Sequence, residues 1–222
     1  MTNLLNDEIV KQIREIFADL KQSVHILFFG RTHGCDYCNE TRQLAEEVVA
    51  LSDKLSLSVY DLDSDAEVAR QYNVDKAPGL VIAAKDGDQI RDLGIRYAGI
   101  PSGHEFSSFI QDILLASGRD SGLSQPTREF LKSLTQPLLL QVFVTPTCPY
   151  CPRAVVLAHM MAMENPQMVR AEMIEATEFP DLANRHGVSG VPHTTINDGR
   201  GHVIGAVPED YLLAEIQRAL LN

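Results

Sequence analysis

The chain has 222 residues, four cysteines and a formal net charge of -11. This charge argues against nucleic acid or an anionic membrane as a partner, because both would repel an acidic protein. None of the apolar runs is long enough to span a bilayer. Residues 1–8 show no basic region followed by an apolar core, so we expect no secretory signal and a cytoplasmic location.

The first half of the chain alternates between helical and strand patterns. Residues 7–21 repeat apolar side chains at helical spacing and predict an amphipathic helix. The elements predicted after it are strand 24–30, helix 38–51, strand 55–62, a short helix at 65–72, strands 79–84 and 95–98, and a helix from about 105 to 115. The predicted order is therefore α-β-α-β-α-β-β-α.

The segment 117–125 is rich in small and polar residues and predicts a domain boundary, which divides the chain into units 1–117 and 118–222. Each unit has an ordinary domain length. The second unit repeats the pattern of the first. Its predicted elements are helix 126–134, strand 138–145, helix 149–163, strand 168–175, a short helix at 179–186, strands 194–197 and 202–206, and helix 208–221.

All four cysteines lie in two Cys-x-x-Cys motifs, Cys35–Cys38 and Cys148–Cys151, about half a chain length apart. Each motif follows a predicted apolar strand. A proline before a later strand recurs at nearly the same offset, in 76–79 and 190–193. The whole unit is therefore duplicated. Cysteines in two close pairs favour catalytic or metal-binding use over a structural disulfide framework.

A strand that ends at a Cys-x-x-Cys motif and turns into a helix is typical of a redox site. Unpaired N–H groups and the dipole at the helix start stabilise a thiolate on the first cysteine. We therefore expect Cys35 and Cys148, at the helix starts, to be the exposed attacking thiols. Cys38 and Cys151, inside the first turn, are expected to resolve the mixed disulfide.

The chain resembles the protein disulfide oxidoreductases, a glutaredoxin-like family with two thioredoxin-like units. Cys148-Pro149-Tyr150-Cys151 reads as a glutaredoxin-type motif, and Cys35-Asp36-Tyr37-Cys38 matches the variable first motif of that family. Residues 97–106 look like its segment before the last helix of the first unit. The resemblance covers essentially the whole chain. It implies an α/β fold of two tandem thioredoxin-like units, each with a central mixed β-sheet flanked by helices.

The resemblance also implies residues that contact the substrate. Pro78 and Pro192 fall where the family has a cis proline facing the disulfide. Ala77 and Val191, just before these prolines, would offer backbone groups to an extended substrate strand, and a tyrosine in each motif would shape the rim of the site. The predicted substrate-binding residues are Ala77, Pro78, Val191, Pro192, Tyr37 and Tyr150.

Other residues near the motifs carry weaker predictions. Thioredoxins have a buried acid on the strand before the motif, but Phe29 and Val142 occupy these positions here, so proton transfer must use water or another group. Arg31, His33 and Arg153 are candidates to favour a thiolate, although charged residues beside a site are more often plain surface. The residue to watch near the second motif is His193, which directly follows Pro192.

The sequence therefore predicts a dithiol–disulfide oxidoreductase that reduces protein disulfides, with oxidation or isomerisation as further directions. We expect this protein to need no cofactor other than its own disulfides, and no metal. A thioredoxin reductase-like flavoprotein or glutathione would supply electrons. The second site is expected to be the more active, because Pro149 pre-sets the first helical turn whereas Asp36 places a negative charge beside Cys35.

Two rival functions remain open from the sequence. The four thiolates could hold zinc or a shared iron–sulfur cluster, but both pairs open long helices in separate repeats rather than tight turns. The other rival is a dedicated electron carrier to a peroxidase-type partner, resembling the two-fold N-terminal piece of the alkyl hydroperoxide reductase flavoprotein. That family keeps a cysteine pair in only one unit, and this chain has two.

Overall fold

The computed structural model describes residues 3–221, so the predictions that touch Met1, Thr2 and Asn222 lie outside the described residues. The first half forms the predicted order of elements. These are α1 (Asp7–Phe17), β1 (Val24–Gly30), α2 (Cys38–Val49), β2 (Leu55–Asp61), α3 (Ala66–Gln71), β3 (Gly79–Asp86), β4 (Gln89–Ala98) and α4 (Glu105–Gly118).

The second half repeats this order. Its elements are α5 (Gln125–Lys132), β5 (Leu138–Val144), α6 (Cys151–Glu164), β6 (Val169–Glu175), α7 (Pro180–Arg185), β7 (His193–Ile196), β8 (Gly201–Ile204) and α8 (Glu209–Leu221). The predicted fold class is therefore confirmed, and most predicted ends differ by only a few residues.

The largest difference from prediction is the start of β4, which begins at Gln89 rather than residue 95. A two-residue turn brings Asp86 opposite Gln89, so pairing with β3 starts at once. Gly87 adopts a φ of 64° in this turn, a conformation that favours glycine. Charged residues in the hairpin interrupt the apolar–polar alternation by which a strand is recognised, so the sequence did not predict the first half of β4.

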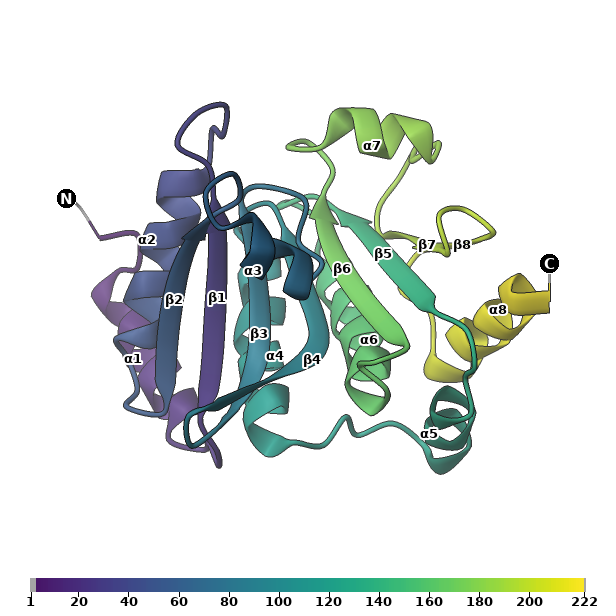
Figure 1. The fold of residues 1–222 in the computed structure, drawn as a ribbon, viewed down its shortest axis with the longest axis horizontal. Coiled ribbons are helices and arrows are strands. Elements are labelled where there is room, and N and C mark those ends of the chain that lie inside the picture. The colour runs from purple at the N-terminus through teal and green to yellow at the C-terminus, as the bar shows by residue number, and fades with distance from the viewer. Residues whose placement is uncertain (1–2, 222) are drawn as a thin grey trace.

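All strands join in one eight-stranded mixed sheet with the order β2-β1-β3-β4-β6-β5-β7-β8. The two halves meet where β4 pairs in parallel with β6, over the register Ile95↔Ala171 to Ala98↔Ile174. We expected a separate central sheet in each unit, and the structure instead fuses them edge to edge (Figure 1). The fusion pairs two strands whose edges would otherwise be open.

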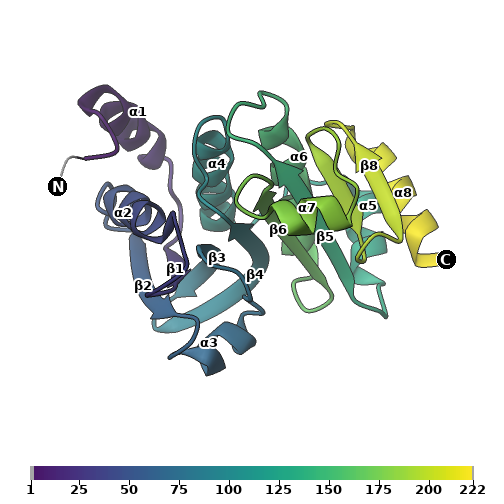
Figure 2. The ribbon, with the colours of Figure 1, turned by 90° about the horizontal axis from the view of Figure 1, so that it is seen from above.

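One apolar core runs along one face of this sheet and crosses from the first half to the second. Helices α1, α2, α4, α5, α6 and α8 all contribute buried side chains to it. Strand β1 shows why: Val24, Ile26 and Phe28 alternate toward this core, and Leu27 and Phe29 toward the opposite face. Figure 2 shows α1, α2, α4 and α6 along one side of the sheet.

The opposite face carries two smaller cores. One lies under α3, where Ala69 and Tyr72 pack on β1 and β3. The other lies under α7, where Ala183 packs on Phe143 and Ile174. Helix α3 lies on this side of the sheet in Figure 2, opposite α1 and α2. The sheet between α3 and α7 is thus left to polar side chains.

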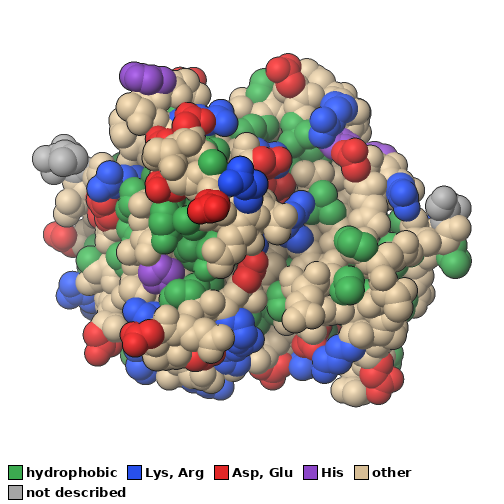
Figure 3. All heavy atoms as spheres, viewed as in Figure 1, with side chains coloured by type: hydrophobic (Ala, Val, Ile, Leu, Met, Phe, Trp, Pro, Cys, Tyr) green, Lys and Arg blue, Asp and Glu red, His purple; other side chains and the backbone are tan. Residues whose placement is uncertain are grey.

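The predicted boundary between residues 117 and 118 falls in the last turn of α4, and the segment 119–124 then leads to α5. Arg119 closes α4 with a left-handed φ of 56°. The boundary stays a prediction, because the shared sheet and core continue across it. On the face drawn in Figure 3, acidic and basic side chains are interspersed over both halves.

Candidate functional site: two disulfides at one end of the sheet

Both Cys-x-x-Cys motifs lie at the same end of the sheet. Strands β1, β4, β6 and β5 all run in the same direction, since β3 is antiparallel to both β1 and β4 and the other pairings are parallel. The motifs follow the ends of β1 and β5. This end is at the top of Figure 1. One molecule therefore presents both redox-active pairs on one side.

The first pair, Cys35–Cys38, is closed as a disulfide. Cys38 is buried and opens α2, whereas Cys35 is half-buried in the turn before the helix. The backbone N–H of Arg31 donates a hydrogen bond of 3.4 Å to Cys38 Sγ. In this pair the backbone donor faces Cys38 Sγ and not the sulfur of Cys35, the predicted attacking thiol.

The second pair, Cys148–Cys151, is also a disulfide. Cys148 is 8% exposed and Cys151 is fully buried. The backbone N–H of Cys151, at the start of α6, donates a hydrogen bond of 3.2 Å to Cys148 Sγ. A helix-terminal N–H that faces a sulfur stabilises its thiolate form and lowers its pKa. In the second pair a backbone N–H therefore faces Cys148, the predicted attacking thiol.

Helix α6 starts two residues later than predicted, at Cys151, whereas α2 starts at Cys38 as predicted. Each begins at the second cysteine, with Tyr37 and Tyr150 as the N-cap residues. The expectation that Pro149 lies in the first helical turn is therefore wrong: it lies in the turn that precedes α6, and Pro152 occupies the first turn instead. The turn must first bring the two sulfurs together, so regular helical hydrogen bonding begins after it.

The predicted prolines both lie beside the cysteines. The Ala77–Pro78 and Val191–Pro192 bonds are cis. Sheet pairing sets Gly79 opposite Phe29, which brings Pro78 to the end of β1. In the second half the Val191 carbonyl oxygen lies 3.7 Å from Cys148 Sγ.

The backbone beside these prolines is free to pair with another chain. Neither the Ala77 nor the Val191 N–H forms a hydrogen bond within residues 3–221. Tyr37 is 47% exposed and Tyr150 is 64% exposed, so both rings stand at the rim. Their contact with a substrate stays a prediction.

The charged residues predicted to favour a thiolate, and His193, lie in different surroundings. Arg31 pairs with Asp63 at 3.6 Å, and both side chains are exposed. His33 and Arg153 are exposed and form no hydrogen bond or ion pair within the described residues. His193 is buried: its Nε2 lies 2.9 Å from His202 Nδ1, so it packs inside the second half rather than at the sulfurs.

Each half lends a loop to the site of the other. A cavity of about 390 Å³ beside Cys35 is also lined by Thr177 and Glu178, from the loop between β6 and α7, and by Pro180, the first residue of α7. In the reverse direction the N–H of His104, in the loop after β4, donates a hydrogen bond of 2.9 Å to the carbonyl of Pro146, just before Cys148. Neither site is complete in one half alone.

Sequence reasoning missed Glu178 because it is far from Cys35 along the chain. Its carboxylate accepts a hydrogen bond of 2.7 Å from the Ile100 N–H. Burial raises its pKa to about 7, and the charges of Glu175 and Asp36 act in the same direction, while the Ile100 hydrogen bond opposes them. Only its position before the short helix at 179–186 could have drawn attention to it.

A second missed carboxyl is Glu105, the first residue of α4, which is 1% exposed. Ser108 donates a hydrogen bond of 2.6 Å to its Oε2, and its Oε1 has no partner within the described residues. Burial raises its pKa to about 7, although Ser108 and His159 act to lower it. This acid directly follows His104, whose N–H contacts Pro146 beside the second site.

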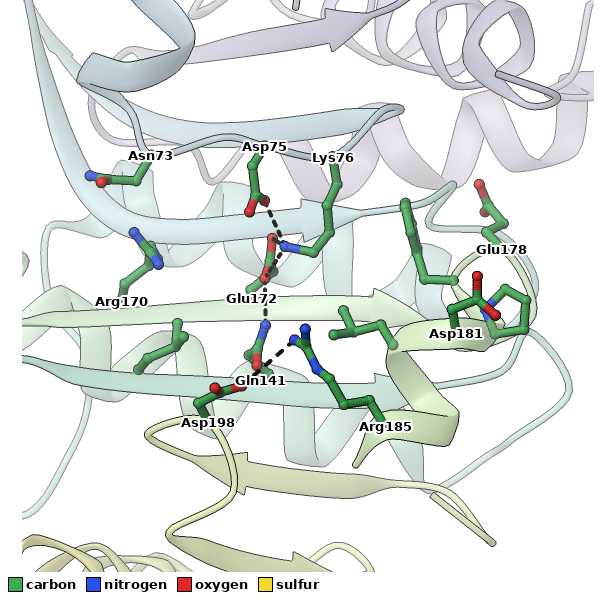
Figure 4. Close-up of a pocket in the computed structure, with 14 residues that line it drawn as sticks. Asn73, Asp75, Lys76, Gln141, Arg170, Glu172, Glu178, Asp181, Arg185 and Asp198 are labelled. Carbon is green, nitrogen blue, oxygen red and sulfur yellow. Dashed lines mark hydrogen bonds and ion pairs between the residues drawn. The ribbon is translucent and has the colours of Figure 1, made fainter. Parts of the chain in front are cut away.

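A polar groove of about 630 Å³ crosses the open sheet face between the two halves (Figure 4). Lys76 Nζ lies 2.7 Å from Asp75 and 3.1 Å from Glu172, and the Gln141 amide donates to Glu172 at 3.1 Å. Glu178 lines one end of this groove as well as the cavity beside Cys35. The groove therefore runs up to the first site.

Within residues 3–221, no group of three or more His, Cys, Asp or Glu side chains is placed to hold a metal ion. In the same residues no helix combines the length and apolarity that crossing a membrane requires. The four cysteines are paired with each other in two disulfides, which is the arrangement that dithiol chemistry needs.

Comparison with known proteins agrees with this geometry. A family model described as a thioredoxin domain matches residues 138–218. The crystal structure of a protein disulfide oxidoreductase from Aeropyrum pernix K1 is 31% identical, with a TM-score of 0.86 over 96% of this chain and 92% of that one. The N-terminal domain of alkylhydroperoxide reductase AhpF from Enterococcus faecalis is 25% identical, with a TM-score of 0.85 over 96% of this chain and 99% of that one.

The curated relatives are longer proteins. The alkyl hydroperoxide reductase AhpF of Pseudomonas aeruginosa is 29% identical over 199 residues, which are 89% of this chain and 32% of that protein. The chain thus spans about a third of the length of these relatives. Its two closed Cys-x-x-Cys pairs and its likeness to the Aeropyrum enzyme over nearly the whole of both chains show that it is a thioredoxin-fold thiol–disulfide oxidoreductase and belongs to the protein disulfide oxidoreductase family.

Proposed function

We propose that this oxidoreductase reduces disulfides in other proteins, and that Cys148–Cys151 carries most of the activity. The observation that carries this proposal is the hydrogen bond of 3.2 Å from the Cys151 N–H to Cys148 Sγ. A donor at that sulfur stabilises the thiolate that must attack. Cys35 lacks a comparable donor within the described residues and stands next to Asp36.

In the reduced enzyme the Cys148 thiolate attacks one sulfur of the substrate disulfide. A mixed disulfide forms, and the other substrate sulfur leaves as a thiolate that takes up a proton. Cys151 then loses its proton and attacks Cys148 Sγ, which releases the second substrate thiol and closes Cys148–Cys151. Two electrons pass from the enzyme dithiol to the substrate.

The substrate would bind as an extended strand beside Val191. The unpaired N–H of Val191 can pair with a substrate carbonyl, and the Val191 carbonyl oxygen lies 3.7 Å from Cys148 Sγ. Strand addition of this kind positions a substrate by main-chain hydrogen bonds and tolerates many sequences. Ala77 would act in the same way beside the first pair, and Tyr37 and Tyr150 would cover the bound strand at the rim.

A closed disulfide must be reopened before the next turnover. We assign this step to a thioredoxin reductase-like flavoprotein or to glutathione, in the reducing environment of the cytoplasm. The enzyme itself then needs no bound cofactor, because its cysteine pairs carry the electrons.

Reduction of insulin by dithiothreitol tests the proposal, with turbidity of the released B chain as the readout. We expect the intact protein to accelerate the reaction and the variant with all four cysteines changed to serine to leave the uncatalysed rate unchanged. Equal rates with the two proteins would refute the proposed function.

A second candidate function is electron delivery to a peroxidase-type partner. It is supported by the match to alkyl hydroperoxide reductase AhpF over 89% of this chain. A dedicated carrier would reduce its peroxidase partner much faster than insulin. Stopped-flow oxidation of the reduced protein by an oxidised two-cysteine peroxidase, compared with insulin at equal disulfide concentration, separates the two functions.

A further inference from the structure

We propose that Glu178, supplied by the second half, makes the Cys35–Cys38 site selective for disulfides flanked by lysine or arginine. The inference rests on the proposed function, since it names the substrate class of one of its two sites. It explains why one chain would carry two Cys-x-x-Cys sites, because two sites with different electrostatics accept different substrates.

The cavity beside Cys35 is acidic. Its walls are formed by Gly34, Cys35, Asp36, Tyr37, Ala77, Pro78, Thr177, Glu178 and Pro180. Asp36 and Glu178 are the charged members of this set, one from each half, and both are carboxylates. No lysine or arginine lines the cavity within the described residues. A substrate segment that enters it meets negative charge from two sides.

The Glu178 carboxylate is held in place rather than free to swing away. Oε1 accepts the Ile100 N–H at 2.7 Å, and the loop itself is fixed where the Glu178 N–H donates to Glu175 at 2.7 Å. Gly99 makes the approach possible: a side chain there would come within 2.8 Å of Oε1. Oε2 forms no hydrogen bond within residues 3–221, so it is left for a ligand.

The ionised form of Glu178 is destabilised by its surroundings, and a bound cation would stabilise it. Burial, Glu175 and Asp36 all disfavour the ionised form of Glu178 and raise its pKa to about 7. A lysine or arginine placed between Asp36 and Glu178 offsets the repulsion and restores full ionisation. An anionic substrate segment instead adds a further like charge in a confined space, so the cavity discriminates in both directions.

The second site has different residues at the positions that correspond to Asp36 and to the loop from the other half. Pro149 stands at the motif position that Asp36 holds in the first, and the loop that the first half lends to the second site brings Gly103 and His104 against Pro146. The charged residue that follows the second motif is Arg153, which is exposed. We therefore expect no preference for cationic substrates at Cys148.

The chemistry is the exchange described above, carried by Cys35 and Cys38. The Cys35 thiolate attacks the substrate disulfide and releases one substrate thiol. Cys38 then displaces the second thiol and closes Cys35–Cys38, so two electrons pass to the substrate. Dithiothreitol reopens the pair in the assay. Glu178 touches the flanking residue of the substrate and takes no part in bond exchange, so it acts as a specificity residue.

The test uses the full chain with Cys148 and Cys151 changed to serine, so that only the first pair reacts. Two disulfide-bridged peptides of equal length carry either lysine or glutamate beside the cysteines. We expect a kcat/KM ratio, lysine peptide over glutamate peptide, of about ten or more at low salt, falling as salt screens the charges. Adding Glu178→Gln should lower the ratio about tenfold, chiefly through KM.

Asp181→Asn is the matched control. Asp181 is an exposed carboxylate three residues further along, and it lines the polar groove without lining the cavity (Figure 4). Its variant should keep the ratio within about twofold. An unchanged ratio in Glu178→Gln, or an equal loss in Asp181→Asn, would overturn the proposal. So would an equally high ratio in the variant with Cys35 and Cys38 changed to serine.

A second measurement does not depend on turnover. In the same serine background with Cys38 also changed to serine, so that no thiol resolves the mixed disulfide formed by the label, the Cys35 thiol is labelled with a cationic and an anionic methanethiosulfonate reagent. We expect the cationic reagent to react faster, and Glu178→Gln to remove most of that advantage. If the first pair reduces neither peptide while the second reduces both, the inference fails and the proposed function stands. If neither pair reduces either peptide, both fail.

Discussion

The backbone N–H of Ile100 donates a hydrogen bond of 2.7 Å to the Glu178 carboxylate, and so ties the loop after β4 to the loop after β6. These loops follow the two strands that fuse the halves into one sheet. The same loops contact the site of the opposite half. The duplicated units therefore share structure at the sheet, at the core and at both disulfides.

We predict that the halves unfold together. Ile174 is fully buried, packs with Ala98 and Phe143, and lies opposite Ala98 in the pairing of β4 with β6. Ile174→Ala should lower the free energy of unfolding by about 2–5 kcal/mol. It should also speed hydrogen exchange of β1 amides in the first half by the same free energy, because both halves open in one cooperative step.

Leu27→Ala provides the reciprocal variant, since Leu27 is buried under α3 in the first half. Its effect should reach the amides of β5 in the second half. Two separate unfolding transitions in urea, or exchange effects confined to the mutated half, would show that the halves are independent domains after all.

The two cysteine pairs should differ in thiol acidity. We expect a lower thiol pKa for Cys148 than for Cys35, because Cys148 receives the Cys151 N–H whereas Asp36 opposes ionisation of its neighbour. Iodoacetamide labelling against pH, followed by peptide mass spectrometry, measures both values in one sample. A lower pKa for Cys35 would reverse the ranking.

Activity should follow the same order. Changing Cys148 and Cys151 to serine should lower the rate of insulin reduction about tenfold or more, while the same change at Cys35 and Cys38 should lower it less than about threefold. The four-serine variant sets the baseline. If the second-pair variant keeps full activity and the first-pair variant loses it, the assignment of the main site is wrong.

Metal removal should leave the activity unchanged. The cysteines close on each other as two pairs, and no three-residue metal cluster is found in the described part of the chain. Protein purified without chelator should contain far less than one equivalent of zinc or iron and show four free thiols after reduction. Stoichiometric metal that is lost together with insulin reduction on EDTA treatment would instead favour the metal-binding alternative.

Local patterns allowed much of this fold to be predicted. The apolar runs before Cys35 and Cys148 mark strands, and the doubling of motif and proline marks two thioredoxin-like units, so the order of elements follows from the sequence. The fusion of β4 with β6 could not be read in this way. Pairing between Ala98 and Ile174 depends on the approach of two distant segments, and no local signal encodes that register.

The site shows the same division. The cysteines and the prolines beside them are recognisable because chemistry fixes their spacing within one unit. Glu178 is far along the chain from Cys35, as Glu105 is from Cys148, and neither belongs to a recognisable motif. Only the folded structure therefore reveals their burial and their raised pKa values. The start of α6 was misplaced because closing the Cys148–Cys151 turn delays the helix, which propensity alone does not register.

The buried carboxyl of Glu105 should make the protein less stable as pH rises. In the folded protein its pKa is raised from 4.5 to about 7, mainly by burial. Below about pH 4.5 the carboxyl is protonated in both states and contributes nothing. As pH increases toward 7, the unfolded chain releases this proton more readily than the folded one, so unfolding becomes easier, and the loss levels off above about pH 7.

Each pKa unit corresponds to about 1.4 kcal/mol, so the shift from 4.5 to about 7 changes the free energy of unfolding by at most about 3.5 kcal/mol. Glu105→Gln keeps an acceptor for the Ser108 hydroxyl but never ionises. Urea unfolding at pH 4.5, 6 and 8 should therefore show the variant gaining stability relative to the natural protein as pH rises. A constant difference across this range would mean that Glu105 ionises in the folded protein as easily as in the unfolded one.

Glu47 gives a control of opposite sign. Burial raises its pKa, but hydrogen bonds from the Leu4 and Leu5 N–H groups and from Gln43 lower it more, so the folded state prefers the ionised form. Its ionisation therefore adds stability above the unfolded pKa, which is lost as pH falls. Glu47→Gln should lose stability relative to the natural protein as pH rises toward about 4.5, the unfolded pKa, and the difference should stay constant above it, where Glu105→Gln gains stability. A general drift of stability with pH cannot produce both results.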